Sequence, residues 1–556
     1  MRKKHFLFAS VLALLCSSST LHAQDFKLTS SGYFKNQGVD VMAFDDIYPE
    51  GHQGGVCIIM NGHRVATNGD IRLEATPGQW QPVPKQLDRK LGDNSITATL
   101  CYPDSSRHLT GFNPMIYPDL HLIYTVNVES KGKNIEVTVD LDRPIPQEFI
   151  GKVGFNLEFF PGSLFGKPWI MDGQSGIFPQ QPNSPLMTTQ PNYLHTGNYH
   201  DGKKSLADMD KLIGKGYSPI VADDIISEPY AKGTKFTSRP DDPYNKVTIE
   251  SLSGDLQLFD GRMNHNNGWF VLRSNIKPGV TKGAVKWIIT PNVVADWMYQ
   301  PVIQTSQIGY HPTQDKEAVI EMDIRDNRKE TAQIIRIDAD GEKVVKNVTP
   351  ANWGKFLRYN YLKVNFTDVK EPGLYKIKYN TSVSPIFRID NDVYARGVWQ
   401  PVLEYFLPVQ MCHMRVNEKY RVWHDCCHMD DAQMAPAHNH IDGYDQKEGL
   451  SKFKPGEVVP GVNIGGWHDA GDFDLRIESQ AGESYILALA YEAFHPNLDV
   501  TSIDQINRVT EIHQPDGKND LLQQVENGAL TVVNGYLALG RLYRGIICND
   551  LRQYVL

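Results

Sequence analysis

The sequence predicts a multidomain protein in which two β-sandwich units are followed by a helical C-terminal part. Two observations support this prediction. Apolar and polar residues alternate with a period of 2 up to about residue 390, and apolar residues recur with a period of 3.6 after residue 391. A chain of 556 residues is also long enough for several hydrophobic cores, since one domain usually takes roughly 100–200 residues.

Residues 1–23 have the pattern of a secretory signal peptide. Three cations at 2–4 precede an apolar run at 6–15, and the small residue Ala23 stands before the expected cleavage point. Cys16 leaves a lipoprotein form open, although Leu15 before it is bulkier than lipoprotein processing usually accepts. We therefore expect an exported protein, whether periplasmic, at the cell surface or secreted, with no transmembrane segment after the signal.

Residues 24–303 are predicted to form an all-β sandwich. Short β-like segments alternate with turns rich in glycine, proline and asparagine. The period-2 alternation is clearest at 123–130 and 135–142, where one face is expected to be buried and the other solvated. The role of this unit stays open between a carbohydrate-binding sandwich and a spacer that packs on the next domain.

Residues 304–390 are predicted to form a second, immunoglobulin-like β-sandwich. They contain β-like segments at 316–324 and 373–379, and a span of about 90 residues is close to the size of one such domain.

Residues 391–556 are predicted to be helical. Apolar residues recur with helical spacing at 481–494 and at 520–546, and Asp520 is the expected N-cap of the second helix. The second helix should bury one apolar stripe, formed by Leu521, Leu522, Val525, Ala529, Val532, Val533, Tyr536 and Leu537.

Charge and cysteine content restrict the partners. The formal net charge is -9, and it becomes -12 once the three cations of the signal are removed, which argues against nucleic acid and favours a neutral substrate. Seven cysteines are too few for a disulfide scaffold in a chain of this length. Cys57 and Cys101 stand alone, whereas Cys412, Cys426 and Cys427 lie close to several histidines.

The stretch GGWHDAGDFD at 465–474 carries the strongest chemical signal. It places Asp469 and Asp472 three positions apart in a loop that its glycines allow to turn tightly. Two neighbouring carboxylates can hold one water, and one of them can act as a base near neutral pH. Trp467 and Phe473 offer flat faces for a sugar ring, while a helix cap or a calcium loop remains the alternative interpretation of the two acids.

Four stretches in the right order carry a resemblance to glycoside hydrolase family 9, the inverting endoglucanases. GGWHDAGDFD resembles the catalytic-base motif of that family, whose usual form is GGWYDAGD. SQIGYHP at 306–312 is similar to the start of the family's immunoglobulin-like module, WHDCCHMDDA at 423–432 to its CHxDDA segment, and NDLLQQVENG at 519–528 to the helix after the base loop. The resemblance covers about residues 304–556.

The resemblance implies a fold, a reaction and residue roles. Residues 391–556 would be the first part of an (α/α)6 barrel, with Asp472 as the general base and Asp469 as the carboxylate that orients the attacking water. The implied reaction is hydrolysis, with inversion, of β-1,4-glucosidic bonds in a plant glucan such as cellulose, mixed-linkage glucan or xyloglucan. No cofactor is required for this chemistry.

The chain departs from the family pattern at the general acid. Inversion needs a protonated carboxyl roughly 6.5–9.5 Å from the base, and the family supplies it from a Glu near the end of the barrel. Glu478 and Glu483 are too close in sequence to Asp472 to be assigned the opposite side of a cleft. We therefore expect a C-terminally truncated catalytic domain that is inactive as written, and an exported, non-catalytic glycan-binding protein stays the alternative.

A cysteine and histidine group is the second candidate site. Cys412, Cys427 and His428 are expected to converge on one point, with further histidines at 438, 440 and 468. Thiolate and imidazole ligands suit a tetrahedral structural zinc, and the resemblance implies such a metal in some members of the family. A disulfide from Cys412 to Cys426 or Cys427 is equally compatible with an exported protein.

Overall fold

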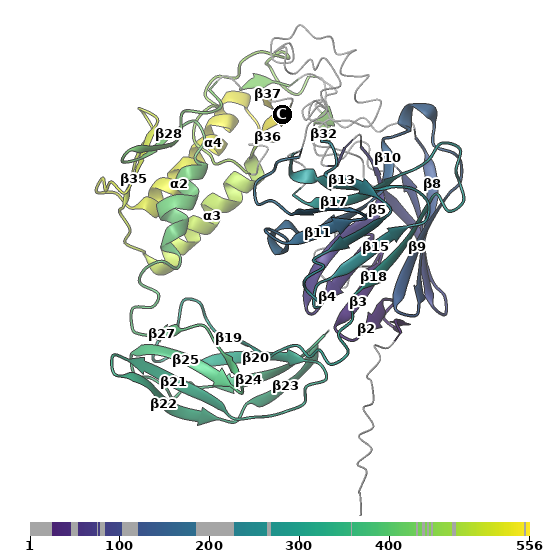
Figure 1. The fold of residues 1–556 in the computed structure, drawn as a ribbon. Coiled ribbons are helices and arrows are strands. Elements are labelled where there is room, and N and C mark those ends of the chain that lie inside the picture. The colour runs from purple at the N-terminus through teal and green to yellow at the C-terminus, as the bar shows by residue number, and fades with distance from the viewer. Residues whose placement is uncertain are drawn as a thin grey trace, which may run out of the picture.

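The computed structural model describes most of the chain between residues 25 and 555, and Figure 1 shows three parts joined in sequence order. The predicted signal peptide lies outside the described residues, as do Asp472 and Phe473. The described residues are 25–45, 54–74, 76–77, 84–102, 120–184, 227–263, 268–356, 358–429, 432–435, 440–441, 444–445, 449–469, 474–549 and 552–555.

The N-terminal part is a sandwich of two antiparallel sheets, each with nine strands among the described residues. In spatial order, the first sheet contains β1 (Lys27–Leu28), β2 (Phe34–Asn36), β3 (Val39–Ala43), β4 (Val56–Met60), β5 (His63–Leu73), β10 (Val153–Phe159), β17 (Phe270–Asn275), β16 (Leu256–Asp260) and β13 (Ala231–Gly233). The second contains β12 (Gln174–Ile177), β11 (Pro168–Met171), β14 (Lys235–Ser238), β15 (Val247–Ser251), β18 (Val285–Pro291), β9 (Asn134–Leu141), β8 (Leu122–Lys131), β7 (Ser95–Tyr102) and β6 (Lys85–Leu91).

The sandwich follows from the alternating sequence. Strands β7, β8 and β9 bury every second residue, so the alternation predicted at 123–130 and 135–142 is confirmed. The inward residues of both sheets form one continuous core that includes Phe155, Trp287 and Ile289. Short 3₁₀ turns η2 (Gln147–Phe149), η3 (Pro161–Ser163) and η4 (Gly261–Met263) lie between strands.

The second part is a smaller sandwich with its own core, built around residues such as Ile320, Leu362 and Ile377. Its first sheet has the order β19 (Val302–Gln304), β20 (Glu317–Asp323), β24 (Tyr359–Asn365) and β23 (Ala351–Phe356). Its second sheet contains β22 (Gly341–Val348), β21 (Ala332–Asp338), β25 (Gly373–Tyr379), β26 (Ser382–Val383) and β27 (Phe387–Ile389). This two-sheet architecture agrees with the predicted immunoglobulin-like unit, which is called the Ig-like module below.

The C-terminal part mixes helices with small sheets. Its helices are the π-helix η5 (Val402–Phe406), α2 (Leu407–Gln410), α3 (Ile477–Phe494) and α4 (Asp520–Leu539), and α3 packs against α4. Its strands are β28 (Arg415–Glu418), β29 (Arg421–His424), β30 (Gln433–Met434), β31 (His440–Ile441), β32 (Tyr444–Asp445), β33 (Leu475–Arg476), β34 (Thr501–Asp504), β35 (Val509–Ile512), β36 (Gly545–Asn549) and β37 (Arg552–Val555). The predicted first part of an (α/α)6 barrel is thus supported only in part.

Helix α4 differs from its sequence-based prediction in two ways. Its N-cap is Asn519, whose side chain accepts hydrogen bonds from the backbone N–H groups of Leu521 and Leu522, and Asp520 is the first helical residue. The expected apolar stripe is largely outside the core, since Leu537 is 70% exposed and Tyr536 51%. The buried face carries small and polar residues instead, namely Gln523, Gln524, Asn527, Gly528, Thr531 and Gly535, together with Leu521.

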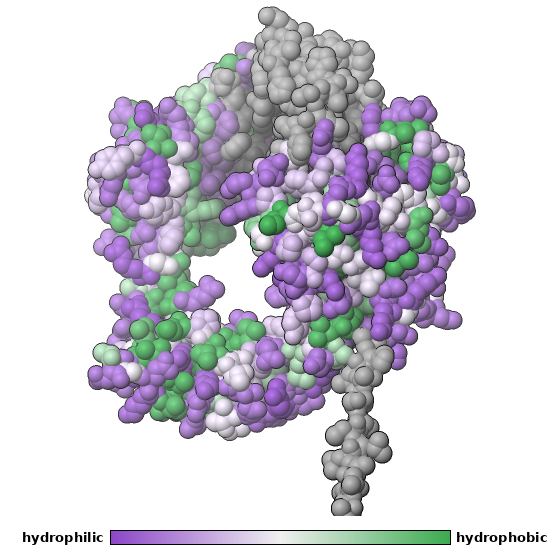
Figure 2. Space-filling model, viewed as in Figure 1, coloured by the Kyte–Doolittle hydropathy of each residue, from purple (hydrophilic) through white to green (hydrophobic). Residues whose placement is uncertain are grey.

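The outer surface is mostly polar on the face drawn in Figure 2, where purple residues dominate both sandwiches. No helix of the described ranges is long and apolar enough to cross a membrane. Contacts join the first sandwich to the Ig-like module: Arg358 and Asp40 form an ion pair of 3.4 Å, and Gln37 donates a hydrogen bond to the carbonyl oxygen of Trp297.

Candidate active site and metal centre

The loop that precedes α3 is held against α4 by its two glycines. Gly465 and Gly466 have φ values of 66° and 83°, a region that favours glycine, and a Cβ on Gly465 would meet the Asn527 carbonyl oxygen. Gly466 donates its N–H to that carbonyl at 2.9 Å, and the Asn527 side chain donates back to the Gly466 carbonyl at 3.0 Å. The loop therefore has a fixed position relative to the helix.

Trp467 lies in the core beneath this loop. Its side chain is 1% exposed, and its indole N–H donates to Gln524 at 2.8 Å. Gln480 of α3 bonds both the N–H and the carbonyl of Trp467. A ring buried in this way offers no face to a sugar, so the structure gives Trp467 a packing position in place of the stacking surface expected from the sequence.

Asp469 reaches the surface next to Arg476. Its carboxylate is 3.4 Å from the Arg476 guanidinium, with the side chain 30% exposed, and its N–H donates to the Asp474 carbonyl oxygen at 2.9 Å. The ion pair and the backbone hydrogen bond leave a carboxylate fixed at the protein surface, where it can accept a hydrogen bond from water.

Two glutamates that follow in α3 have different surroundings. Glu478 pairs with Arg544, so its carboxylate is neutralised by a cation. Burial, and secondly the charge of Asp469, raise the pKa of Glu483. A carboxyl with a raised pKa holds its proton to higher pH than an ordinary glutamate does.

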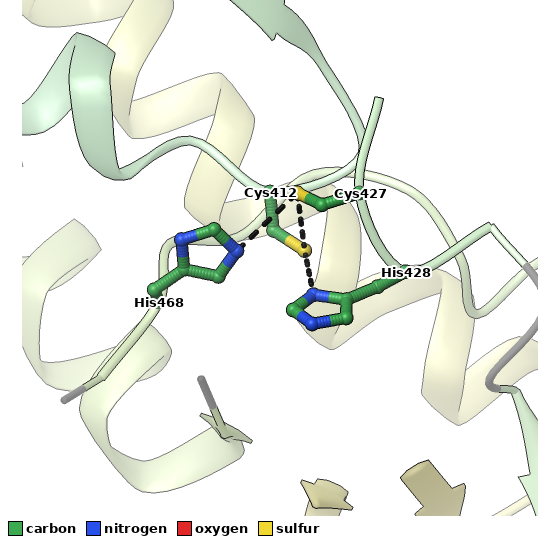
Figure 3. A group of neighbouring side chains, drawn as sticks. All are labelled: Cys412, Cys427, His428 and His468. Carbon is green, nitrogen blue, oxygen red and sulfur yellow. Dashed lines mark hydrogen bonds between the residues drawn. The ribbon is translucent and has the colours of Figure 1, made fainter. Parts of the chain in front are cut away.

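Cys412, Cys427 and His428 do converge, and His468 joins them (Figure 3). The Cys412 sulfur is 2.9 Å from Nδ1 of His428, and the Cys427 sulfur is 3.3 Å from Nε2 of His468. The two sulfurs are 3.7 Å apart, well beyond the roughly 2.05 Å of a disulfide bond, so neither cysteine is part of a disulfide. One potential ligand atom from each of the four residues lies within 4.8 Å of the other three.

The electrostatics of this group favour an anionic sulfur. The hydrogen bond between Cys427 and Cys412, followed by the bonds of Cys427 with His424, His428 and His468, holds the pKa of the Cys427 thiol far below its usual range, against the opposing effect of burial. The hydrogen bond to Cys427 likewise raises the pKa of His424. His413, close by and fully buried, has its pKa lowered to about 4 by burial.

Two sulfur and two nitrogen ligands fit a structural zinc site. Zinc prefers four such ligands in a tetrahedron, and the set here is partly to fully buried. The ligands come from two stretches, 412–428 and the loop at 468, so a bound ion would join the loop that carries Asp469 to the preceding segment. The distance between the Cys412 and Cys427 sulfurs opposes a disulfide between them, and the bound zinc is taken up below as a proposal.

The sequence did not single out His468 among the histidines available to the metal. Two backbone hydrogen bonds bring His468 close to the cysteines. The N–H of His468 donates to the Gln410 carbonyl oxygen, and the N–H of Cys412 donates to the Gly466 carbonyl oxygen, each at 2.9 Å. The motif WHDAGD already placed a histidine one position before Asp469, which is the signal that could have favoured it.

Comparison with known proteins assigns one part of the chain to a known domain family. Residues 298–384 match the family model described as the cellulase N-terminal ig-like domain. This match confirms the Ig-like module, and with it the resemblance to family 9 glycoside hydrolases that carry such a module.

Three solved structures show a weaker likeness. A metagenome-derived glycoside hydrolase family 9 endoglucanase is 24% identical over 46% of each chain, with a TM-score of 0.35. A Zn-binding triple mutant of the family 9 endoglucanase J30 is 21% identical over 44% of each chain, with a TM-score of 0.34. A Bacteroides ovatus GH9 protein is 19% identical over 46% of this chain and 45% of that one, also with a TM-score of 0.34. No curated protein matches. The chain thus spans less than half the length of these proteins.

Proposed function

We propose that this protein is a glycoside hydrolase of the family 9 type that cuts β-1,4-glucosidic bonds in a plant glucan with inversion. The observation that carries the proposal is the loop at 465–469, which its two glycines and Asn527 fix against α4 and which presents the carboxylate of Asp469 at the surface. The cellulase-type Ig-like module directly before this part of the chain supports the same reaction class. Export by the predicted signal peptide would bring the enzyme to a polysaccharide outside the cell.

The proposed roles cover the water-activating side of inversion, and no described residue is assigned to the general acid. Asp472 accepts the proton of the attacking water as general base, and Asp469, anchored by Arg476, orients that water. Phe473 stacks on a sugar ring beside the two acids. A zinc ion held by Cys412, Cys427, His428 and His468 would supply structural support to the loop, and no catalytic step depends on it.

The test is the loss of turnover in Asp472→Asn. In the full-length protein this change should lower reducing-sugar release from soluble β-glucan and xyloglucan by about 10²- to 10⁴-fold, because the amide keeps the shape but cannot accept the proton. Asp340→Asn, on an exposed turn of the Ig-like module, is the matched control and should hydrolyse normally. Near-normal turnover by Asp472→Asn would remove that residue from the mechanism.

Asp469→Asn separates the two acids. Loss of a residue that only orients water should lower the rate of hydrolysis less than loss of the general base, so Asp469→Asn should keep more activity than Asp472→Asn. A ranking in the opposite order would exchange the two roles.

A further inference from the structure

A row of five aromatic side chains runs from the segment just before β19 onto the outer face of the Ig-like module. In order they are Trp297, Tyr299, Tyr359, Tyr361 and Trp353. Successive ring centroids are 6.3, 5.1, 6.1 and 5.6 Å apart, so each ring contacts the next. This row lies away from the loop at 465–469 in sequence and belongs to different elements.

The row faces outward because of strand alternation. Tyr359 and Tyr361 of β24 point to the outer side of the sheet, whereas Asn360 and Leu362 between and after them are buried. A bulge in the pairing of the edge strand β23 adds one residue between Asn352 and Gly354, and that extra residue is Trp353, 56% exposed. A tryptophan placed on the surface by a bulge is available to a ligand.

Hydrogen bonds hold the row in place before any ligand binds. The two oxygens of Glu321 accept from the hydroxyls of Tyr299 and Tyr361, at 2.8 and 3.0 Å. The carbonyl of Trp297 accepts from Gln37 of the first sandwich and from Arg325 of the Ig-like module, each at 2.8 Å. The Tyr299 and Tyr361 side chains, and the backbone at Trp297, are thus ordered beforehand and lose little freedom on binding, which favours recognition.

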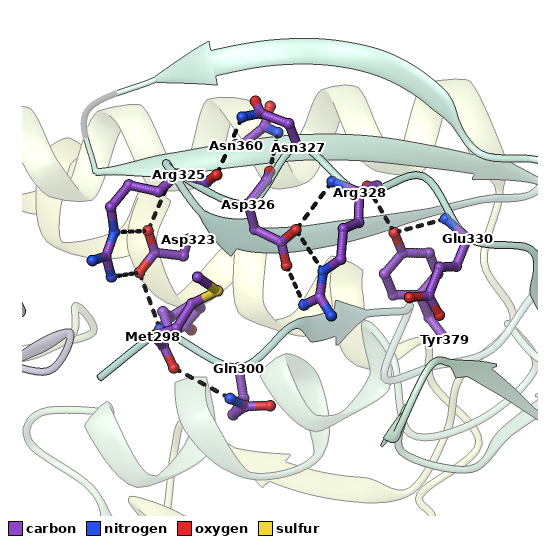
Figure 4. Close-up of polar contacts among 11 residues, drawn as sticks. Met298, Gln300, Asp323, Arg325, Asp326, Asn327, Arg328, Glu330, Asn360 and Tyr379 are labelled. Carbon is purple, nitrogen blue, oxygen red and sulfur yellow. Dashed lines mark hydrogen bonds and ion pairs between the residues drawn. The ribbon is translucent and has the colours of Figure 1, made fainter. Parts of the chain in front are cut away.

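One end of the row enters a pocket of about 480 Å³ between the first sandwich and the Ig-like module. Trp297, Tyr299 and Tyr359 line it, and domain interfaces are a common place for ligand pockets of this size. Its lining carries four cations and three carboxylates, so the charges nearly balance. Two opposite pairs are in contact: Arg325 lies 2.8 Å from Asp323 (Figure 4), and Arg358 pairs with Asp40 across the interface. Such a pocket presents hydrogen-bonding groups without a strong net charge.

We propose that the aromatic row and the pocket together bind a single, soluble β-glucan chain. A neutral polymer of repeating rings suits a line of aromatic faces that ends among paired charges, and the choice of glucan rests on the proposed function. Adjacent rings are inclined by 61°, 55°, 66° and 89°, so they share no plane. The surface therefore fits a flexible single chain rather than the flat face of crystalline cellulose.

The experiment measures binding in a catalytically disabled protein. The full-length protein carrying Asp472→Asn is run on native gels that contain barley β-glucan or xyloglucan, and its retardation is compared with a gel without polysaccharide. Adding Trp353→Ala or Tyr361→Ala should weaken the apparent affinity about tenfold, as expected for one stacking ring. Trp399→Ala, a similarly exposed tryptophan outside the row, is the matched control and should bind as before.

The outcomes separate this proposal from the hydrolase proposal. Equal retardation of the three added variants, absence of retardation in the parent protein, or stronger binding to microcrystalline cellulose than to soluble glucan would each overturn the binding site. A dimer in sedimentation that Trp353→Ala dissolves, with no glucan effect, would show that the row is an interface between two copies and would also overturn it. Unchanged hydrolysis in Asp472→Asn would instead contradict the hydrolase mechanism and leave the binding result standing. Unchanged thermal unfolding of each variant confirms that the fold is kept.

Discussion

Cys427 shows how single residues connect distant parts of the chain. Its sulfur lies between Cys412 and His468, and the hydrogen bonds around it favour the thiolate that a metal would need. The adjacent Cys426 is exposed and stands outside the group of four ligands. Two neighbouring cysteines thus occupy very different environments.

This contrast gives a test of the metal site. Cys427→Ser should abolish bound zinc and lower the melting temperature, because three ligands hold the ion far less tightly than four, whereas Cys426→Ser should keep about one zinc per chain. Metal analysis and thermal unfolding with and without a chelator measure both. Equal zinc in the two variants, or a Cys412–Cys427 disulfide in peptide mapping, would refute the site.

The environment of Asp70 predicts how the stability of the protein changes with pH. Burial, opposed by Arg72 and by hydrogen bonds from Ile71 and Tyr124, raises the pKa of this carboxyl to about 6. The folded protein then binds more protons than the unfolded chain between about pH 4 and 6, so stability is lost as the pH rises through that window. The shift corresponds to on the order of 2–3 kcal/mol.

Asp70→Asn should therefore reduce the fall in melting temperature between about pH 4 and 7, a range that spans this window. Part of the fall should remain, since burial also raises the pKa of Glu74, to about 7. Asp88→Asn, at an exposed carboxylate of the same sandwich, should leave the profile unchanged. An unaltered profile in Asp70→Asn would contradict the assignment.

Sequence reasoning succeeded for residues close together and failed where distant segments decide burial. The spacing of Cys412, Cys427 and His428 was enough to predict their convergence, which the structure brings about. Trp467 was expected to stack on sugar, but the structure buries it. Its burial depends on Gln480 and Gln524 from two helices, and the loop sequence does not reveal that these helices pack there. Exposure is a property of the packed molecule, and a motif does not contain it.

Helix α4 illustrates the same limit for a whole element. Its helical spacing was predicted, yet the face turned inward is the one whose polar groups bond the loop at 465–467. Gln524 and Asn527 meet their partners there, so the free energy of the contact comes from satisfied hydrogen bonds as well as apolar burial. A periodic pattern predicts that a helix forms, but it does not say which neighbour the helix will meet.

The glycines of the two helices provide a matched pair of variants. A Cβ on Gly528 of α4 would meet the Trp467 ring and the Ser484 hydroxyl, whereas one on Gly482 of α3 would meet nothing within 4 Å. Gly528→Ala should lower the free energy of unfolding by about 1–3 kcal/mol through overpacking. Gly482→Ala should raise it by about 0.5–1 kcal/mol through higher helix propensity.

Denaturant unfolding of both variants checks this prediction. The sign of the effect is the decisive result, since both changes add the same methyl group to a helix. If Gly528→Ala also stabilised the protein, the close packing of α4 on Trp467 would be wrong.

At the scale of the whole molecule, the two β-sandwiches were the most predictable feature. Local alternation is enough to identify strands such as β8 and β9, because it depends only on which residues face the core. Sheet order could not be predicted in the same way, since pairs such as β10 with β17 join segments far apart in sequence. The pocket between the first sandwich and the Ig-like module depends on that long-range arrangement, and no sequence motif indicated it.

The position of β18 has a consequence for how the protein is made. This strand lies between β15 and β9 in its sheet, and Val285 pairs with Val139. A ribosome must therefore deliver nearly the entire first sandwich before β9 gains its second neighbour, and closing so long a loop is slow. Until then the nascent chain exposes an unpaired strand edge, which can associate with other chains. If the predicted signal peptide exports the chain, a slow-folding first domain would keep the polypeptide unfolded during translocation, and the topology that delays folding would help it to pass through a narrow export channel.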